Sequence, residues 1–160
     1  MSAPDASTRI ARTPQRFGTI VVVGGGCYGG YYVRQLRRAQ RASAILWDRL
    51  IVVDRDPDCA VAALPVSNRP PGMEVVVDRW DTFMACFLDR AADNPDAGTA
   101  DAIVPSPLMP HLMAEWLLAR AADRWPRRTL ASAPLGGVPP VPWQRTGEDG
   151  THYVSFAEWM

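Results

Sequence analysis

The chain has 160 residues and a formal net charge of zero, with 17 basic and 17 acidic side chains. Its composition is 48% hydrophobic and 21% charged, which suits one core and gives no general attraction to nucleic acid or to a membrane surface. Every basic side chain is arginine, so a Schiff-base lysine and a Walker-type phosphate loop are excluded.

Residues 1–16 are rich in Ser, Thr, Pro, Ala and Arg and lack the apolar stretch of a secretory signal, so we expect a flexible arm. No apolar run in the chain approaches the length of a membrane span, and we expect no membrane insertion. The cysteines are Cys27, Cys59 and Cys86, an odd number with no C-x-x-C spacing. They argue against a disulfide framework and a zinc site and favour a reducing, cytoplasmic setting.

A continuous apolar run at residues 19–23 is typical of a parallel strand that is buried on both faces. It enters a loop with the spacing G-x-G-x-x-G, and a helix is expected over residues 27–40. In this strand–loop–helix setting the spacing is the dinucleotide-binding fingerprint. Gly24 would permit the tight turn, Gly26 would let a pyrophosphate approach the backbone, and Gly29 would let the helix pack on the strand. The predicted cofactor-binding residues of the loop are Gly24, Gly25, Gly26, Cys27, Tyr28 and Gly29.

The second strand is expected at residues 50–53 and ends at Asp54. Residues 42–48 are expected to lengthen the connection before it as a loop or a short helical extension. The Asp54 carboxylate would accept the ribose hydroxyls of an adenosine and would repel a 2′-phosphate, so NAD is the predicted cofactor. Arg55, as the next residue, keeps NADP open as an alternative. An ordinary turn or helix-capping aspartate is the competing interpretation of Asp54.

Strands and helices are expected to alternate along the rest of the domain. They comprise a short helical turn at 59–64, strands at 74–77, 101–104 and 129–131, and helices at 80–92 and 112–124. Met113 and Leu117 are expected on the buried face of the last helix. Asp78 follows the third strand, where it is a candidate for contacting adenine or for starting the next helix. The alternation predicts a doubly wound, parallel-sheet α/β domain of Rossmann-like type over residues 17–133.

The segment after the fourth strand holds both candidate catalytic residues. Its sequence, Pro-Ser-Pro-Leu-Met-Pro-His at residues 105–111, lies beside the expected switch point, where open α/β sheets bind ligands. His111 would shuttle a proton beside a nicotinamide, and Ser106 would donate a hydrogen bond to a ligand. The competing interpretation of His111 is an exposed residue at a helix start.

Residues 134–160 form a small C-terminal appendage. Four prolines and two glycines come first, and two β-rich pieces at 143–146 and 152–156 then flank polar turn residues, which predicts a hairpin. The apolar ending at residues 157–160 is expected to dock on the domain or to join a homodimer or a partner chain.

The pattern resembles the TrkA-type, or RCK, nucleotide-binding regulators of potassium transport over residues 18–124. The features in common are the glycine loop, the Asp-x-Asp-Pro stretch at 54–57, Asp78 after the third strand, and Ala-Asp-Ala-Ile-Val at 100–104. The resemblance implies a Rossmann-type fold and a nucleotide ligand. The proline-rich loops and the terminal hairpin are not part of that pattern, so the potassium-regulatory role is not carried over. The triple glycine is also similar to flavin enzymes and to siroheme-forming dehydrogenases.

Two hypotheses for function come from these features. The first is an NAD-dependent oxidoreductase, or its cofactor-binding subunit, that acts on a small substrate with His111 as the acid–base residue. The alternative is a non-catalytic module that senses a nucleotide or works as a scaffold. A methyltransferase that uses S-adenosylmethionine is a third reading, which the complete G-x-G-x-x-G spacing disfavours.

Overall fold

The computed structural model divides the chain into two units, residues 1–126 and 127–160, and each is described by itself. It describes residues 13–93, 100–109, 111–131, 136–137, 140–148, 150 and 152–155. Most of the predicted N-terminal arm and the apolar ending at 157–160 lie outside the described residues. Within the part that is described, no helix has the length and apolar character needed to cross a bilayer.

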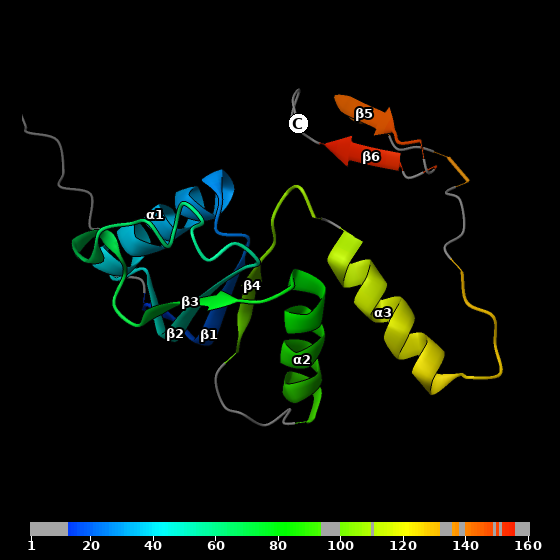
Figure 1. Ribbon diagram of the computed structural model, residues 1–160, viewed down its shortest axis with the longest axis horizontal. Coiled ribbons are helices and arrows are strands. Elements are labelled where there is room, and N and C mark those ends of the chain that lie inside the picture. Colours follow the sequence, from blue (N-terminus) through cyan, green and yellow to red (C-terminus); the bar gives the residue numbers. More distant parts are fainter. Residues whose placement is uncertain are drawn as a thin grey trace, which may run out of the picture. The chain divides into compact units, whose positions relative to one another are not determined.

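The first unit is built on a four-stranded parallel sheet, which confirms the α/β class (Figure 1). Its strands are β1 (Gln15–Val23), β2 (Ile45–Asp54), β3 (Met73–Val77) and β4 (Ala102–Val104). They lie in the order β3-β2-β1-β4, so the chain winds to one side of β1 and then returns to the other. The carboxyl ends of β1 and β4 therefore border the point where open α/β sheets hold their ligands.

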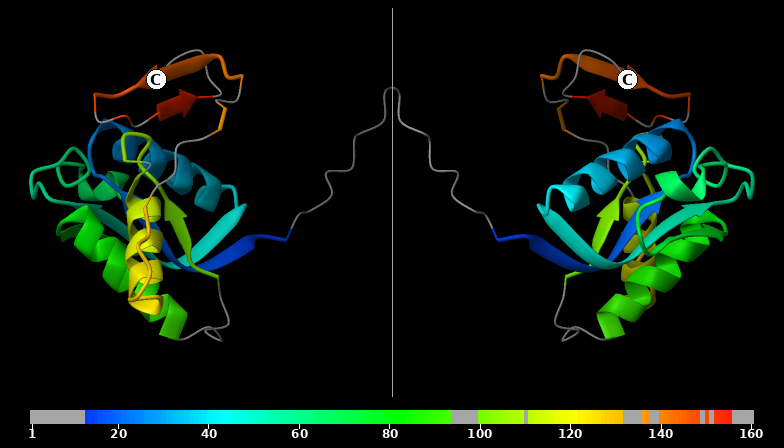
Figure 2. Two further views of the ribbon diagram at one scale, coloured as in Figure 1. Left: turned by 90° about the vertical axis from the view of Figure 1, so that its right-hand side faces the viewer. Right: turned by 90° about the vertical axis from the view of Figure 1, so that its left-hand side faces the viewer.

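Helices cover both faces of this sheet (Figure 2). One face packs against α1 (Cys27–Arg41), and the other packs against α2 (Trp80–Asp93) and the start of α3 (His111–Arg124). Successive side chains of a strand point to opposite faces. Accordingly, Val22 joins the core cluster of α1, whereas Val21 joins that of α2. The continuous apolar run predicted to be buried on both faces is buried in that way.

Both β1 and β2 are longer than the sequence predicts. The two strands pair from Gln15 with Ile45 and include Phe17 with Trp47. The prediction of a loop or helical extension over residues 42–48 is therefore wrong from Ile45 onward. The exposed polar residues at 48 and 49 interrupt the apolar pattern, but their side chains form ion pairs with Arg16 and Glu74. Strand pairing and the burial of Trp47 outweigh the local pattern.

Residues 55–72 join β2 to β3 through turns and a short 3₁₀ helix, η1 (Val66–Asn68). The N–H of Ala63 donates to the carbonyl of Cys59, which is the single helical turn expected there. The N–H of Val61 donates to the carbonyl oxygen of Gly25 at 2.9 Å, and the Val61 side chain is fully buried. The connection between β2 and β3 is therefore held against the glycine loop by this hydrogen bond and by the packing of Val61.

Two expectations about the end of the first unit are wrong. Residues 129–131 do not form a strand and fall in the second unit. Met113 and Leu117, which were expected in the core, are 41% and 54% exposed. The described residues add no fifth strand to the parallel sheet beside β4, so within the first unit α3 packs on α2 and on the sheet end. It does so through the buried Leu112 and through Trp116, whose indole N–H donates to Asp89.

The second unit contains the predicted hairpin. Strands β5 (Trp143–Thr146) and β6 (His152–Ser155) pair antiparallel. The two ring nitrogens of His152 lie 2.9 Å from Thr146 Oγ1 and 3.2 Å from Gln144 Oε1. The hairpin therefore holds its histidine between neighbouring side chains of the same small sheet.

Candidate functional site

The glycine loop has the two structural properties that its spacing predicts. Gly24 leaves β1 with φ of +88°, a conformation that is strained for any residue with a Cβ atom, and its N–H donates to the carbonyl of Val53. A Cβ atom on Gly29 would lie 1.9 Å from the carbonyl oxygen of Gly24. The first helix can lie this close to the end of β1 only because residue 29 has no side chain.

Gly26 stands at the start of α1 and faces open space. It is the N-cap residue of the helix, which has no side-chain cap and no acidic residue in its first turn. A Cβ atom at this position would meet no atom within 4 Å. The first N–H groups of a helix lack partners within the helix, and this end of the helix dipole is positive. The loop therefore presents donors suited to an anionic group.

Asp54 ties the end of β2 to the glycine loop. Its side chain is buried, with Oδ2 accepting the N–H of Gly25 at 2.6 Å and Oδ1 accepting the N–H of Asp56 at 2.9 Å. A carboxylate has about four acceptor positions, so these two bonds leave capacity for ligand hydroxyls. The bonds from the N–H groups of Gly25 and Asp56 thus orient the carboxylate and leave acceptor positions for the hydroxyl groups of a ligand.

A cavity of about 410 Å³ lies over the loop and includes most of the predicted site. Its lining consists of Gly24, Gly26, Cys27, Tyr28, Gly29, Asp54, Trp80, Ser106, Leu108 and Met109. Gly25 is buried beside it and contributes the bond to Asp54. The fold therefore brings the loop, the end of β2 and the segment after β4 to one place.

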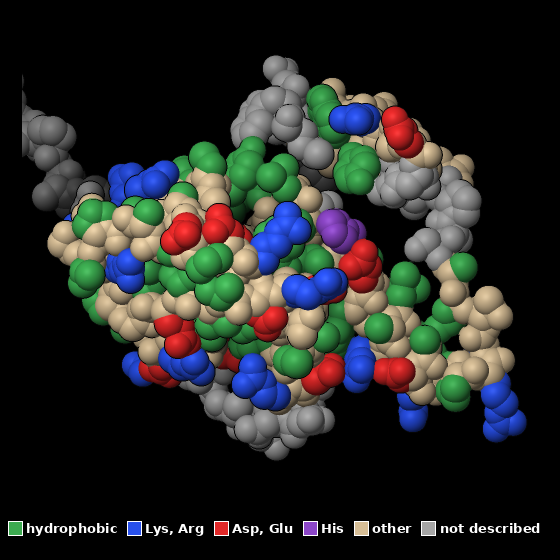
Figure 3. All heavy atoms as spheres, viewed as in Figure 1, with side chains coloured by type: hydrophobic (Ala, Val, Ile, Leu, Met, Phe, Trp, Pro, Cys, Tyr) green, Lys and Arg blue, Asp and Glu red, His purple; other side chains and the backbone are tan. Residues whose placement is uncertain are grey.

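Three predicted site residues lie elsewhere. The N–H of Asp78 donates to the carbonyl oxygen of Asp54, and its carboxylate accepts the N–H of Arg79. Arg55 and the exposed His111 line a neighbouring cavity of about 320 Å³. Figure 3 shows acidic, basic and histidine side chains close together on this face of the molecule. Ser106 and His111, the two candidate catalytic residues, thus line different cavities.

Sequence reasoning missed Trp80, which lines both of these cavities. The Arg55 guanidinium lies 4.7 Å from the centre of the Trp80 ring, a cation–π contact. Trp80 is the first residue of α2 and comes three positions after Val77, the last residue of β3. Because that position lies at the carboxyl edge of the sheet, it could have been included on topology alone.

An ion pair at the edge of the neighbouring cavity controls the acidity of Asp81. The Arg79 guanidinium donates to both carboxylate oxygens, at 3.1 and 2.7 Å. These bonds, with a smaller contribution from the N–H of Thr82, lower the pKa of Asp81 from its ordinary 3.8 to about 2. The pairing also raises the pKa of Arg79.

We expect the Asp81 carboxyl to titrate near pH 2 in the folded chain and Arg79→Met to return its pKa toward 3.8. Since the folded pKa is below the unfolded one, the stability from this pair is complete above about pH 4 and is lost as the pH falls through about 2. Carboxyl-carbon NMR titration measures both values. An Asp81 midpoint near 3.8 in the unmodified chain would contradict the described pairing.

The thiols do not form a metal cluster in the described part of the chain. Cys59 is buried beneath Gly25, whereas Cys27 and Cys86 are exposed. Across the described residues, no three His, Cys, Asp or Glu side chains gather in a way that could hold a metal ion.

Comparison of the chain with protein-family models, curated proteins and solved structures finds no match. The function is therefore inferred from the site's own geometry and chemistry.

Proposed function

We propose that the first unit binds NAD in the cavity over the glycine loop. The observation that carries the proposal is the 2.6 Å bond from the Gly25 N–H to Asp54 Oδ2, which fixes an acidic side chain against the loop. The helix-start N–H groups at Gly26 would hold the pyrophosphate, and the remaining acceptor positions of Asp54 would hold the adenosine ribose. The sheet order and the helices on both faces support a doubly wound, Rossmann-like arrangement.

Charge favours NAD over NADP at this site. Asp54 provides the only formal charge in the cavity lining within the described residues. Arg55 stacks on Trp80 in the neighbouring cavity, and it is not part of this lining. A 2′-phosphate would therefore meet a buried carboxylate with no paired cation, which is electrostatically unfavourable.

We further propose that the chain is an oxidoreductase or its cofactor-binding subunit. NAD supplies the hydride chemistry when it is bound. The chain's residues would hold the pyrophosphate at Gly26, orient the ribose at Asp54 and place Ser106 beside the ligand. Ser106 suits this task because it is 7% exposed and its hydroxyl oxygen accepts the N–H of Leu108, which leaves its proton for donation.

A non-catalytic nucleotide-sensing module is the second candidate function. The specific observation that favours it is the position of His111, which is exposed and does not line the glycine-loop cavity. His111→Ala separates the two functions. An oxidoreductase that uses this imidazole would transfer hydride from NADH to the carbon of an added carbonyl acceptor while His111 gives a proton to its oxygen. The His111→Ala chain would then keep NAD affinity and lose this reaction, which the fall in NADH absorbance measures. A sensing module would bind NAD equally well with or without His111 and exchange no hydride.

Calorimetric titration with NAD and NADP tests the proposed site. We expect NAD to bind at least about tenfold more tightly than NADP, a difference of about 1.4 kcal/mol. Asp54→Asn keeps the size of the side chain and removes its charge, so the ratio of the two dissociation constants should fall toward one. Asp58→Asn is the matched control, because Asp58 is an exposed aspartate of the same connection. Equal affinities in the unmodified chain, or an unchanged ratio in Asp54→Asn, would refute the assignment.

A further inference from the structure

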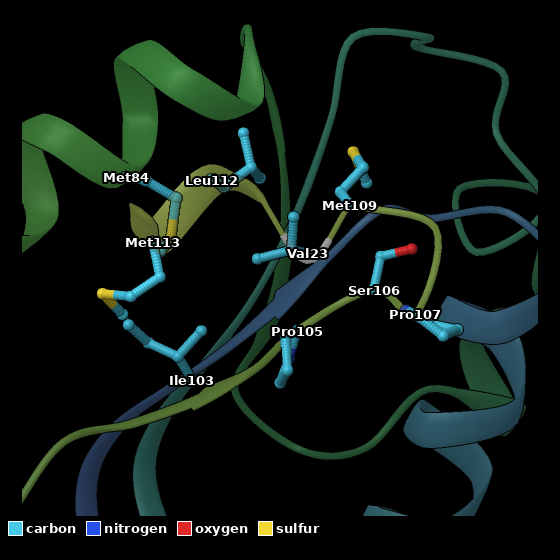
Figure 4. A pocket seen from close by; sticks show the side chains of 9 residues that line it. All are labelled: Val23, Met84, Ile103, Pro105, Ser106, Pro107, Met109, Leu112 and Met113. Carbon is cyan, nitrogen blue, oxygen red and sulfur yellow. The ribbon is translucent and has the colours of Figure 1, made fainter. Parts of the chain in front are cut away.

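A third cavity, of about 430 Å³, adjoins the glycine-loop cavity (Figure 4). It lies at the carboxyl ends of β1 and β4, next to α2 and the start of α3. The lining residues are Val23, Met84, Ile103, Pro105, Ser106, Pro107, Met109, Leu112 and Met113. Its volume is within the range of small-molecule sites, roughly 300–1,000 Å³.

The chemistry of this lining is almost wholly apolar. Among the described residues that line it, Ser106 has the one polar side chain and none is charged. The Ser106 hydroxyl accepts the N–H of Leu108 and points away from Ile103 and Met113 in Figure 4. A carboxylate or phosphate in this cavity would lose its hydration without gaining a charged partner, which is costly. A neutral, hydrocarbon-rich group would lose little hydration free energy on entering the cavity.

Three methionines give the cavity an adaptable wall. Met84 is buried at 3%, whereas Met113 is 41% exposed at the outer side. Methionine side chains are flexible and polarisable, so they fit apolar ligands of different shape. This lining favours a class of apolar ligands over one polar molecule that is recognised by directed hydrogen bonds.

The two cavities share a boundary. Ser106 and Met109 line both of them, and a Cβ atom on Gly24 would lie 3.4 Å from the Met109 methyl carbon and 3.9 Å from Ser106 Cβ. A group in the apolar cavity would therefore lie next to a nucleotide on the glycine loop. The two ligands would meet at Ser106 and Met109, the side chains that line both cavities.

We propose that this apolar cavity binds the uncharged, hydrocarbon-rich part of a second small molecule. The residues that line the cavity are sufficient support for a binding site of that chemical class. Its assignment as the substrate site rests on the proposed NAD-binding function. The expected substrates are neutral molecules with an alkyl or aryl group, rather than carboxylates or phosphate esters.

Fluorescence of N-phenyl-1-naphthylamine, a neutral apolar probe, tests the ligand class on the full chain. We expect the probe to bind saturably and 1-octanol to displace it at a concentration at least about tenfold lower than octanoate does, because the carboxylate must be desolvated. The two competitors have the same chain length and differ in charge. Absence of probe binding, or equal displacement by octanol and octanoate, would overturn the proposal.

Two glutamate substitutions on α3 locate the probe. Met113→Glu places a carboxylate in the cavity wall, and Leu117→Glu places the same group one helical turn away, outside the lining. Both positions are exposed enough for the charged side chain to reach water. We expect Met113→Glu to weaken probe binding by about tenfold or more and Leu117→Glu to leave it unchanged. Equal effects of the two substitutions would place the probe elsewhere and overturn the assignment.

Parallel NAD titrations keep this inference separate from the proposed function. A chain that binds NAD but neither the probe nor octanol overturns the apolar site and leaves the NAD site standing. A chain that binds octanol in preference to octanoate and does not bind NAD supports the apolar site and overturns both NAD binding and the substrate role. A chain that binds both NAD and the octanol-displaceable probe, and in which Met113→Glu weakens only the binding of the probe, supports both the apolar site and the NAD site.

Discussion

Gly29→Ala is expected to be the most damaging single substitution in the first unit. The new methyl carbon would lie 1.9 Å from the carbonyl oxygen of Gly24 and 2.9 Å from its carbonyl carbon. Both are backbone atoms of the turn, so α1 would have to move away from the end of β1. Overpacking of this kind costs about 1–3 kcal/mol and more when backbone must shift, against a total stability of about 5–15 kcal/mol for an ordinary domain.

Urea unfolding followed by circular dichroism measures this loss, and Gly30→Ala is its matched control. The nearest atom to a Cβ atom at Gly30 is the end of the flexible Arg34 side chain, at 3.4 Å. Alanine is the better helix former by about 1 kcal/mol, so Gly30→Ala should be neutral or stabilising. If Gly29→Ala unfolds at the same urea concentration as the unmodified chain, the close contact between the helix start and the turn is wrong.

Gly26→Val is expected to weaken NAD binding strongly and leave the first unit folded. A Cβ atom at Gly26 would meet no atom within 4 Å, so we expect a valine side chain to be accommodated and to occupy the place proposed for the pyrophosphate. Valine is a poorer N-cap than glycine, at a cost of about 1 kcal/mol. We expect the NAD dissociation constant to rise by about 100-fold, or about 2.7 kcal/mol, in a calorimetric titration.

Ser67→Val provides the control for that experiment. Ser67 is an exposed residue of η1 in the first unit and does not line the glycine-loop cavity. Its substitution should leave NAD affinity unchanged. A Gly26→Val chain with the affinity of the unmodified protein would show that no phosphate lies against the helix start.

Local patterns in the sequence predicted the elements that hold the site. The apolar run before Gly24 and the glycine spacing are consecutive in the chain, and Asp54 is recognised because it directly follows a second apolar run. The structure places the loop and Asp54 together. The hairpin of β5 and β6 was found from its polar turn in the same way. Strong local patterns can be interpreted without knowledge of the tertiary fold.

Features that depend on distant contacts were not predicted. The first half of β2 was missed because its strand character comes from pairing with Gln15–Phe17 and from ion pairs across the sheet. Met113 and Leu117 have helical apolar spacing, but the described residues add no fifth strand to the parallel sheet, and both side chains are exposed. In both places, tertiary contacts outweigh local propensity in determining secondary structure and burial.

Only part of the candidate site could be identified before the fold was known. Glycines and an aspartate at fixed spacing indicate a nucleotide, whereas Trp80 and Met109 enter the lining through the packing of separate elements. The same limitation applies to Ser106 and His111, which are five positions apart in the chain and line different cavities. Proximity in sequence did not predict a shared site.

Amide NMR during an NAD titration tests the central claim most directly, because it reports both binding and its location. The account predicts saturable shifts for the amides of Gly25, Gly26 and Cys27 and for those next to Asp54, with unchanged amides in the last turn of α1 at 38–41. Gly25 is informative because its N–H already donates to Asp54 and should respond when the carboxylate binds ribose. Unshifted glycine-loop amides at saturating NAD, or shifts confined to another region, would contradict the account.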